Sequence, residues 1–150
     1  MMNRRQLAPV LAALALATAT FSPAVFAASA SADAEEKVVY HVNDSDNASA
    51  ALRNIGNHLS ASPEAKIVVV THSKGIDFLL NDAKDKNGNP YELIVQRLKG
   101  KGVDFRVCNN TLVSRKMDAS TVIPEASIVP SGVAEIGRLQ AKEGYVYLKP

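Results

Sequence analysis

The sequence predicts an α/β domain in which helices cover both faces of a parallel β-sheet. Two observations lead to this fold class. From Glu36 onward, short runs of β-branched and other apolar residues alternate with segments whose apolar residues recur at helical spacing, as in a parallel sheet with crossover helices. In addition, residues 66–71 (KIVVVT) are apolar almost throughout, which is typical of a strand covered on both faces.

Five segments have the composition of strands. The first, residues 37–42 (KVVYHV), is rich in β-branched residues, and Pro130 ends the fourth. The third, residues 103–107 (VDFRV), ends directly before Cys108. We expect right-handed crossovers between the strands. The predicted strands are residues 37–42, 66–71, 103–107, 126–129 and 145–148.

The segments between the strands have the caps and the spacing of helices. Residues 44–46 (Asp-Ser-Asp) are capping residues ahead of the first helix, and Pro90 suits the first turn of a later one. In the last helix, Val133, Ile136 and Leu139 recur at helical spacing and should face the core. The predicted helices run from residue 46 to about 59, from 75 to 83, from 90 to about 100, from 109 to about 117 and from 131 to 144.

The start of the chain has the three parts of a secretory signal peptide. Arg4 and Arg5 supply the positive charge, residues 7–20 form an apolar run, and residues 25–27 (VFA) resemble a cleavage site. The apolar run is shorter than the roughly 20 residues that a membrane-spanning helix needs. We therefore expect a signal peptide at residues 1–27, export to the periplasm and no membrane attachment after cleavage. An uncleaved membrane anchor is the alternative.

Cleavage after Ala27 leaves a short lead-in and one domain. Residues 28–36 are small or acidic and are expected to be disordered, and residues 37–150 form the domain. The chain has 17 basic and 15 acidic residues, and the expected signal peptide holds two of the basic ones and no acidic one. The mature chain is therefore formally neutral, which removes the electrostatic support for a nucleic-acid partner.

Cys108 is the only cysteine of the chain, so no disulfide can form within it. It lies directly before a predicted helix N-terminus, where free N–H groups and the helix dipole stabilise a thiolate. The thiolate is the form that attacks sulfur. A second interpretation is a buried packing residue, as free cysteines often are. An unpaired thiol in an oxidising compartment favours the first interpretation.

Other candidate residues follow the ends of the predicted strands. In open α/β sheets, ligands bind beyond the carboxyl ends of the strands. His72 is a candidate base or hydrogen-bond partner for Cys108, although a satisfied or exposed structural histidine is the simpler interpretation. His41 and His58 are interpreted as structural. The candidate binding residues at this edge are Asn43, Gly75, Asn109, Asn110, Thr111, Ser131 and Gly132.

The motifs of several other site classes are absent from the sequence. His41, His72 and Cys108 lack the spacing of zinc ligands, and we expect no metal and no other cofactor. No G-x-S-x-G segment is present, so Ser73 and Ser131 are weak candidates for a hydrolase nucleophile. The chain also lacks the G-x-G-x-x-G and P-loop patterns that bind nucleotides.

Residues 102–112 (GVDFRVCNNTL) resemble the cysteine-bearing segment of the DsrE/DsrF-like proteins. Residues 129–150, which include Pro-Ser-Gly-Val-Ala-Glu-Ile and Glu-Gly-Tyr, resemble the ending of one branch of that family. The first strand and the helix after it fit as well. The resemblance implies a three-layer α/β/α sandwich around a five-stranded, mainly parallel sheet. It also implies a homo-oligomer, either a trimer or a hexamer.

The resemblance further implies a role for Cys108. Better-known members of the family carry sulfur as a persulfide, in oxidative sulfur metabolism or in tRNA thiolation, and Cys108 matches their cysteine. Those carriers are cytoplasmic, whereas this chain is expected to be exported, and the branch it resembles is largely without an assigned function. We expect a periplasmic sulfur carrier, sulfurtransferase-like if it is an enzyme. Without a second cysteine, it must release its sulfur to the thiol of a partner protein.

Two other functions stay open at this point. In one, the chain is a non-enzymatic oligomeric module that binds a small ligand at the same edge, and Cys108 is structural. In the other, Cys108 is a redox sensor that forms an intermolecular disulfide. A Cys108 thiol with neither solvent access nor polar neighbours would exclude the carrier.

Overall fold

Five strands form one sheet in the order β4-β3-β2-β1-β5, and all neighbouring strands run parallel. The computed structural model describes residues 35–150. The prediction of a five-stranded parallel sheet is therefore confirmed, with the third strand moved by one residue and the fifth shortened by one. The strands are β1 (Lys37–Val42), β2 (Lys66–Thr71), β3 (Asp104–Cys108), β4 (Ala126–Val129) and β5 (Val146–Leu148).

The strand register brings two of the candidate residues level with each other. Val42 pairs with Thr71, and Thr71 pairs with Val107. His72 directly follows Thr71, and Cys108 directly follows Val107. Both side chains therefore lie at the carboxyl edge of the sheet, one at the end of each of two neighbouring strands.

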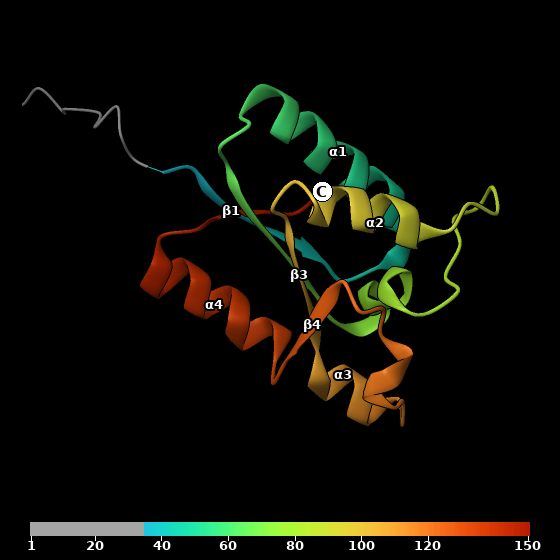
Figure 1. The fold of residues 1–150 in the computed structure, drawn as a ribbon. Coiled ribbons are helices and arrows are strands. Elements are labelled where there is room, and N and C mark those ends of the chain that lie inside the picture. The colour runs from blue at the N-terminus through green and yellow to red at the C-terminus, as the bar shows by residue number, and fades with distance from the viewer. Residues whose placement is uncertain (1–34) are drawn as a thin grey trace, which may run out of the picture. The chain divides into compact units, whose positions relative to one another are not determined.

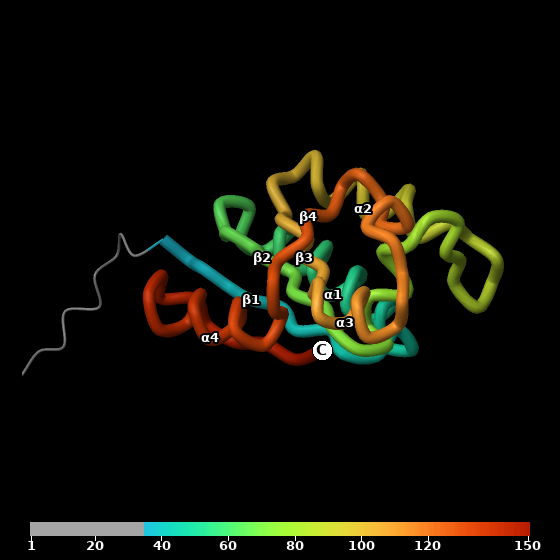
Figure 2. Tube along the Cα trace, turned by 90° about the horizontal axis from the view of Figure 1, so that it is seen from below, coloured from blue at the N-terminus to red at the C-terminus, as the bar shows by residue number. Residues whose placement is uncertain are grey.

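Helices cover both faces of the sheet and complete the expected three-layer sandwich (Figure 1). One face carries α1 (Ala48–Ala61) and α2 (Tyr91–Lys99), and the other carries α4 (Gly132–Glu143). Figure 2 shows the separation of α4 from α1 and α2 in a view turned by 90°. The shorter elements are α3 (Asn109–Ser114) and the 3-10 segments η1 (Ser45–Asn47), η2 (Ser73–Leu79) and η3 (Ala119–Thr121).

Two apolar clusters separate these layers. The larger one lies between the sheet and α1 and α2, and it includes Phe105 and Val107 of β3. The smaller one lies under α4 and includes Val39 of β1. Because side chains alternate between the faces of a strand, His41 shares the α4 face with Val39, and Cys108 points away from the face of Val107.

Three of the predicted helices differ from the structure. The helix predicted from residue 75 to 83 is the 3-10 segment η2, because the extended residue Leu80 ends it and forms a β-bridge with Val122. The α3 helix stops before Met117, since Lys116 adopts a left-handed φ of 54°. Val133 is 65% exposed rather than inward, because Gly132 and not Val133 faces the sheet in the first turn of α4.

Glu36, directly before β1, is fixed by hydrogen bonds to two other elements. Glu36 accepts a hydrogen bond from the ring of His58 at 2.8 Å, and its carbonyl accepts one from the N–H of Lys66 at 2.7 Å. The expected signal peptide, its cleavage after Ala27 and residues 28–34 of the expected lead-in lie outside the described residues. Between residues 35 and 150, no helix is both long enough and apolar enough to cross a membrane.

Candidate functional site

Cys108 lies where the N-terminal ends of two helices meet the carboxyl edge of the sheet. It is the last residue of β3 and the N-cap of α3. Because its side chain lies on the α4 face, it also meets Gly132, the first residue of α4. The residue is only 4% exposed. The thiol is therefore nearly buried, but its neighbours are polar.

Three residues, which we call the sulfur cradle, surround the thiol of Cys108 with polar groups: Asn110, Thr111 and Gly132. The groups of the cradle that favour the thiolate are the hydroxyl of Thr111 and the backbone N–H groups of Gly132, Thr111 and Asn110, of which the last also donates to the carbonyl of Pro130 at 3.3 Å. Burial by itself raises the pKa of the thiol, but these donors outweigh burial and hold the pKa below its usual value. They do so because they stabilise the charged thiolate and not the neutral thiol.

The hydroxyl of Thr111 is itself oriented by the backbone. Its oxygen accepts a hydrogen bond from the N–H of Ser73 at 3.0 Å, which leaves its own proton available to Cys108, whose pKa the hydroxyl lowers. Ser73 takes a left-handed φ of 53° to make this contact, a conformation that costs a non-glycine residue energy. Thr111 is buried, with 8% exposure, so the contact is shielded from solvent.

We expect Thr111→Val to raise the pKa of the Cys108 thiol by about one unit, since it keeps the shape of the side chain and removes one donor to the thiolate. The rate of alkylation by iodoacetamide, followed across pH, measures that pKa. The profile should rise with pH through the pKa, so its midpoint moves to higher pH in the variant. Thr111→Ser keeps the hydroxyl and serves as the control. An unchanged midpoint in Thr111→Val would show that the hydroxyl does not reach the sulfur.

Gly132 lets α4 approach the strand ends closely. A Cβ atom at this position would lie 3.0 Å from the carbonyl oxygen of Thr71, 3.2 Å from the Cβ of Cys108 and 3.4 Å from the Cβ of His72. Any larger residue would push the first turn of α4 away from the sulfur. The preceding residue, Ser131, caps α4 by accepting the N–H of Ala134 at 3.4 Å. Cys108 and His72 therefore flank Gly132.

A row of hydrogen-bonded side chains crosses the strand ends beside Cys108. His72 contacts Ser73 Oγ through Nδ1 at 2.9 Å and His41 Nε2 through Nε2 at 2.7 Å, and His41 Nδ1 contacts the hydroxyl of Tyr147 at 2.7 Å. One proton lies between the two Nε2 atoms, so one ring donates and the other accepts. The sequence interpretation of His41 as structural therefore missed its direct contact with His72.

Both imidazoles of this row are neutral at neutral pH. Burial, followed by the charges of His72 and Lys149, lowers the pKa of His41 to about 4. Burial and the charge of Lys149 also lower the pKa of His72. Two rings that share one proton cannot both be charged without a clash of N–H groups. The pair therefore carries no net charge at rest and can accept a proton near Cys108.

The comparisons with known proteins bear directly on this site. A model of the DsrE/DsrF-like family matches residues 11–150. The chain belongs to this family. A search of curated proteins found no match.

Two solved structures are similar to this DsrE/DsrF-like chain. MTH1491 from Methanobacterium thermoautotrophicum, described as a protein of unknown function, is 30% identical, with a TM-score of 0.69 over 77% of this chain and 100% of its own. The ychN protein from E. coli is 14% identical, with a TM-score of 0.64 over 77% of this chain and 99% of its own. The second likeness shows the fold alone.

The other candidate residues of this DsrE/DsrF-like chain lie near the cradle without donating to the sulfur. Gly75 packs against the end of β1, where a Cβ would lie 2.8 Å from the Cα of Asn43. Asn109 is exposed at the start of α3. Of the predicted binding residues, three therefore meet at Cys108: Asn110, Thr111 and Gly132. Ser131 caps α4. The other three do not contact the sulfur: Asn43, Gly75 and Asn109.

A polar hollow of about 450 Å³ borders the cradle and is lined by Ser73, Lys74, Asp77, Thr111, Ser114 and Arg115. Thr111 belongs both to this polar hollow and to the sulfur cradle. Arg115 forms an ion pair with Asp77, so the side chain of Lys74 adds a positive charge to the lining. A lining of this charge favours a small anion.

Two further features bear on what the site can hold. A second hollow, of about 390 Å³, lies along α1 and α2 and contains none of the cradle residues. Within residues 35–150, no three His, Cys, Asp or Glu side chains are grouped so that they could hold a metal ion.

Proposed function

We propose that the protein is a periplasmic sulfur carrier that holds a persulfide on Cys108. The observation that carries this proposal is the position of Cys108, which ends β3, caps α3 and packs against Gly132 at the start of α4, where polar groups lower the pKa of its thiol. Membership of the DsrE/DsrF-like family makes the carrier function plausible. The periplasmic location rests on the signal-peptide pattern of residues 1–27.

Loading of Cys108 needs no oxidant if the donor already contains sulfane sulfur. The Cys108 thiolate attacks the outer sulfur of a donor such as thiosulfate and forms a new S–S bond. The S–S bond of thiosulfate breaks, and sulfite leaves with the electron pair. Cys108 then carries a persulfide, and the total charge is unchanged. The polar hollow beside Thr111, with the positive charge of Lys74, suits the approach of such an anion.

Release of the sulfur depends on the same donors. The thiolate of a partner protein attacks the outer sulfur of the persulfide, and the Cys108 thiolate is the leaving group. A thiol with a lower pKa leaves faster, so the sulfur cradle accelerates this step. The neutral histidine pair lies across Gly132 from Cys108 and can take the proton of the incoming thiol.

The expected trimer or hexamer is part of the proposal. Strand β5 at the edge of the sheet exposes Val146 at 62%, Tyr147 at 37% and Leu148 at 39%. Exposed apolar side chains on an edge strand favour association with another chain. Static light scattering that reports only a monomer would contradict this part.

The low exposure of Cys108 favours a second function. With 4% exposure, the thiol could serve to complete the packing of a module that binds a small anion in the polar hollow without chemistry. The same low exposure argues against the redox sensor, since an intermolecular disulfide needs an accessible thiol.

Intact-mass spectrometry tests the proposal. Protein incubated with thiosulfate or polysulfide should gain mass in steps of one sulfur atom, and a thiol reductant should remove the gain. Protein alkylated beforehand at Cys108, its only cysteine, is the control and should gain nothing. If the unmodified protein gains no sulfur from either donor, the anion-binding module replaces the carrier.

A further inference from the structure

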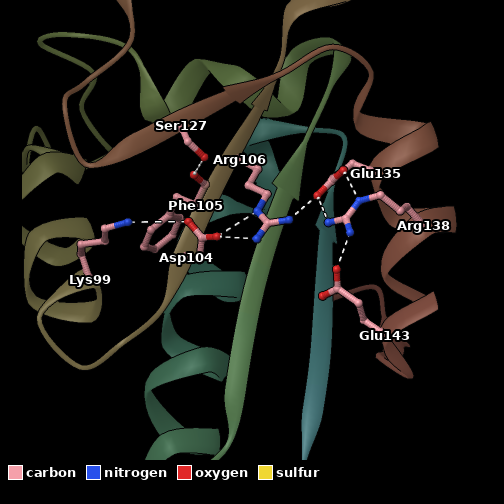
Figure 3. Close-up of polar contacts among 8 residues, drawn as sticks. All are labelled: Lys99, Asp104, Phe105, Arg106, Ser127, Glu135, Arg138 and Glu143. Atoms are coloured by element: carbon pink, nitrogen blue, oxygen red, sulfur yellow. Dashed lines mark hydrogen bonds and ion pairs between the residues drawn. The ribbon is translucent and has the colours of Figure 1, made fainter. Parts of the chain in front are cut away.

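A network of charged side chains connects β3 with α4 (Figure 3). Arg106 donates to Asp104 on its own strand, at 2.8 and 2.7 Å, and forms an ion pair with Glu135 of α4. Glu135 also accepts hydrogen bonds from Arg138, at 3.0 and 2.7 Å. Arg138 in turn pairs with Glu143 near the end of the helix.

The link between Arg106 and Glu135 is the most shielded part of this network. The side chain of Arg106 is 19% exposed and that of Glu135 is 11% exposed, whereas Glu143 is 41% exposed. Ion pairs are screened less when they are partly buried, and removal of one partner leaves the other charge uncompensated. This pair can therefore hold two elements together, which exposed pairs do weakly.

The position of this pair relates it to the thiol. Arg106 lies two residues before Cys108 on the same face of β3. Glu135 lies three residues after Gly132, which is about one turn of α4. The pair thus joins the strand that ends in Cys108 to the helix turn that packs against it, where a Cβ at Gly132 would lie 3.2 Å from the Cβ of Cys108.

We propose that Arg106 and Glu135 are positioning residues, whose ion pair holds the first turn of α4 over Cys108 and keeps the N–H of Gly132 on the sulfur. The inference deepens the proposed function, because it assigns the control of thiol reactivity to a pair that touches neither the sulfur nor a donor molecule. Gly132 alone permits the close approach but does not enforce it.

The change in the thiol pKa distinguishes a positioning role of Glu135 from two simpler roles, a purely electrostatic one and a purely stabilising one. If the carboxylate acted only through its negative charge, its removal would make the surroundings of Cys108 more positive and lower the thiol pKa. If it contributed only to stability, the unfolding temperature would fall and the thiol pKa would stay constant. A positioning role predicts a higher thiol pKa, since the donor from Gly132 is lost.

The test compares Glu135→Ala with Glu143→Ala. Both variants remove one carboxylate from α4 together with its ion pair to Arg138, but only the first breaks the link to Arg106. The thiol pKa is measured by ultraviolet absorbance of the thiolate during a pH titration, with the unfolding temperature recorded by circular dichroism. We expect Glu135→Ala to raise the pKa by about one unit, a tenfold lower thiolate fraction below both values, and Glu143→Ala to change it much less.

The outcomes are distinguishable from those of the sulfur-loading experiment, because the titration needs no sulfur donor. A pKa that falls or stays constant in Glu135→Ala, or that rises equally in Glu143→Ala, would overturn the inference. If Glu135→Ala does not fold, Glu135→Gln takes its place, since its amide oxygen can accept one hydrogen bond of Arg106, and a smaller rise is expected. A wild-type protein that takes up no sulfur, with the pKa shift present, would refute only the carrier.

Discussion

Cys108→Ser is expected to abolish sulfur uptake and to change the free energy of unfolding by less than about 1 kcal/mol. A serine oxygen accepts hydrogen bonds from the same N–H groups of Asn110, Thr111 and Gly132 that approach the sulfur. The cradle thus stays satisfied, while the nucleophile is lost because a hydroxyl is not ionised near neutral pH. Intact mass after incubation with thiosulfate and chemical denaturation by urea measure the two effects.

Cys108→Ala provides the control for this substitution. Alanine removes the acceptor that the N–H groups of Thr111 and Gly132 face in a site that is nearly closed to solvent, which costs about 1–3 kcal/mol. We therefore expect alanine to be clearly less stable than serine at this position. The reverse order would mean that Cys108 packs as an apolar group, and it would favour the anion-binding module. Sulfur uptake by the serine variant would place the loading site elsewhere.

Much of the fold could be predicted from local patterns. Strands such as β2 can be recognised in the sequence, because both of their faces are buried and almost every residue is therefore apolar. The amphipathic helix α1 is equally clear, since its buried residues recur at helical spacing. The prediction of an α-helix after β2 was wrong, because Gly75 and the apolar residues after it are also compatible with a helix. Only the close approach to β1 and the bridge from Leu80 to Val122 make it a 3-10 segment.

Part of the candidate site followed from the same patterns. A cysteine between a strand and a helix N-terminus predicts donors from that helix, and Asn110 and Thr111 do help to lower the pKa of the thiol. Gly132 comes from a strand and helix further along the chain, and the general rule about strand ends was enough to include it. The contact between Ser73 and Thr111 could not be predicted, since it depends on a left-handed φ at a serine.

His41 and Tyr147 were missed because their proximity depends on strand order. They are far apart in the sequence and meet only because β5 pairs with β1 at the edge of the sheet. The alternation of side chains along β1 does place His41 on the face opposite Val42, which was a usable signal. Without the order of the strands, however, nothing in the sequence indicates that this face continues to His72.

Gly75→Ala is expected to destabilise the fold by about 3 kcal/mol, a large effect for one methyl group. A Cβ at this position would lie 2.0 Å from the carbonyl oxygen of Val42 and 2.6 Å from its carbonyl carbon. These are backbone atoms of β1, held in the sheet by pairing with β2, so they cannot move aside. The 3-10 segment η2 must move instead, and urea denaturation measures the loss of stability.

The displacement of η2 in Gly75→Ala should change the pKa of the Cys108 thiol as well as the stability of the fold. Gly75 is joined to His72 by a hydrogen bond of 2.9 Å from its N–H, and Ser73 between them orients Thr111. A shift of η2 therefore loosens one donor of the cradle, and the thiol pKa should rise along with the loss of stability.

Gly137→Ala is the matched control, because nothing lies within 4 Å of its Cβ in α4. Alanine there should stabilise the helix by about 1 kcal/mol. Equal stability of the two variants would mean that η2 yields easily, and the thiol would then be held by α3 and α4 alone.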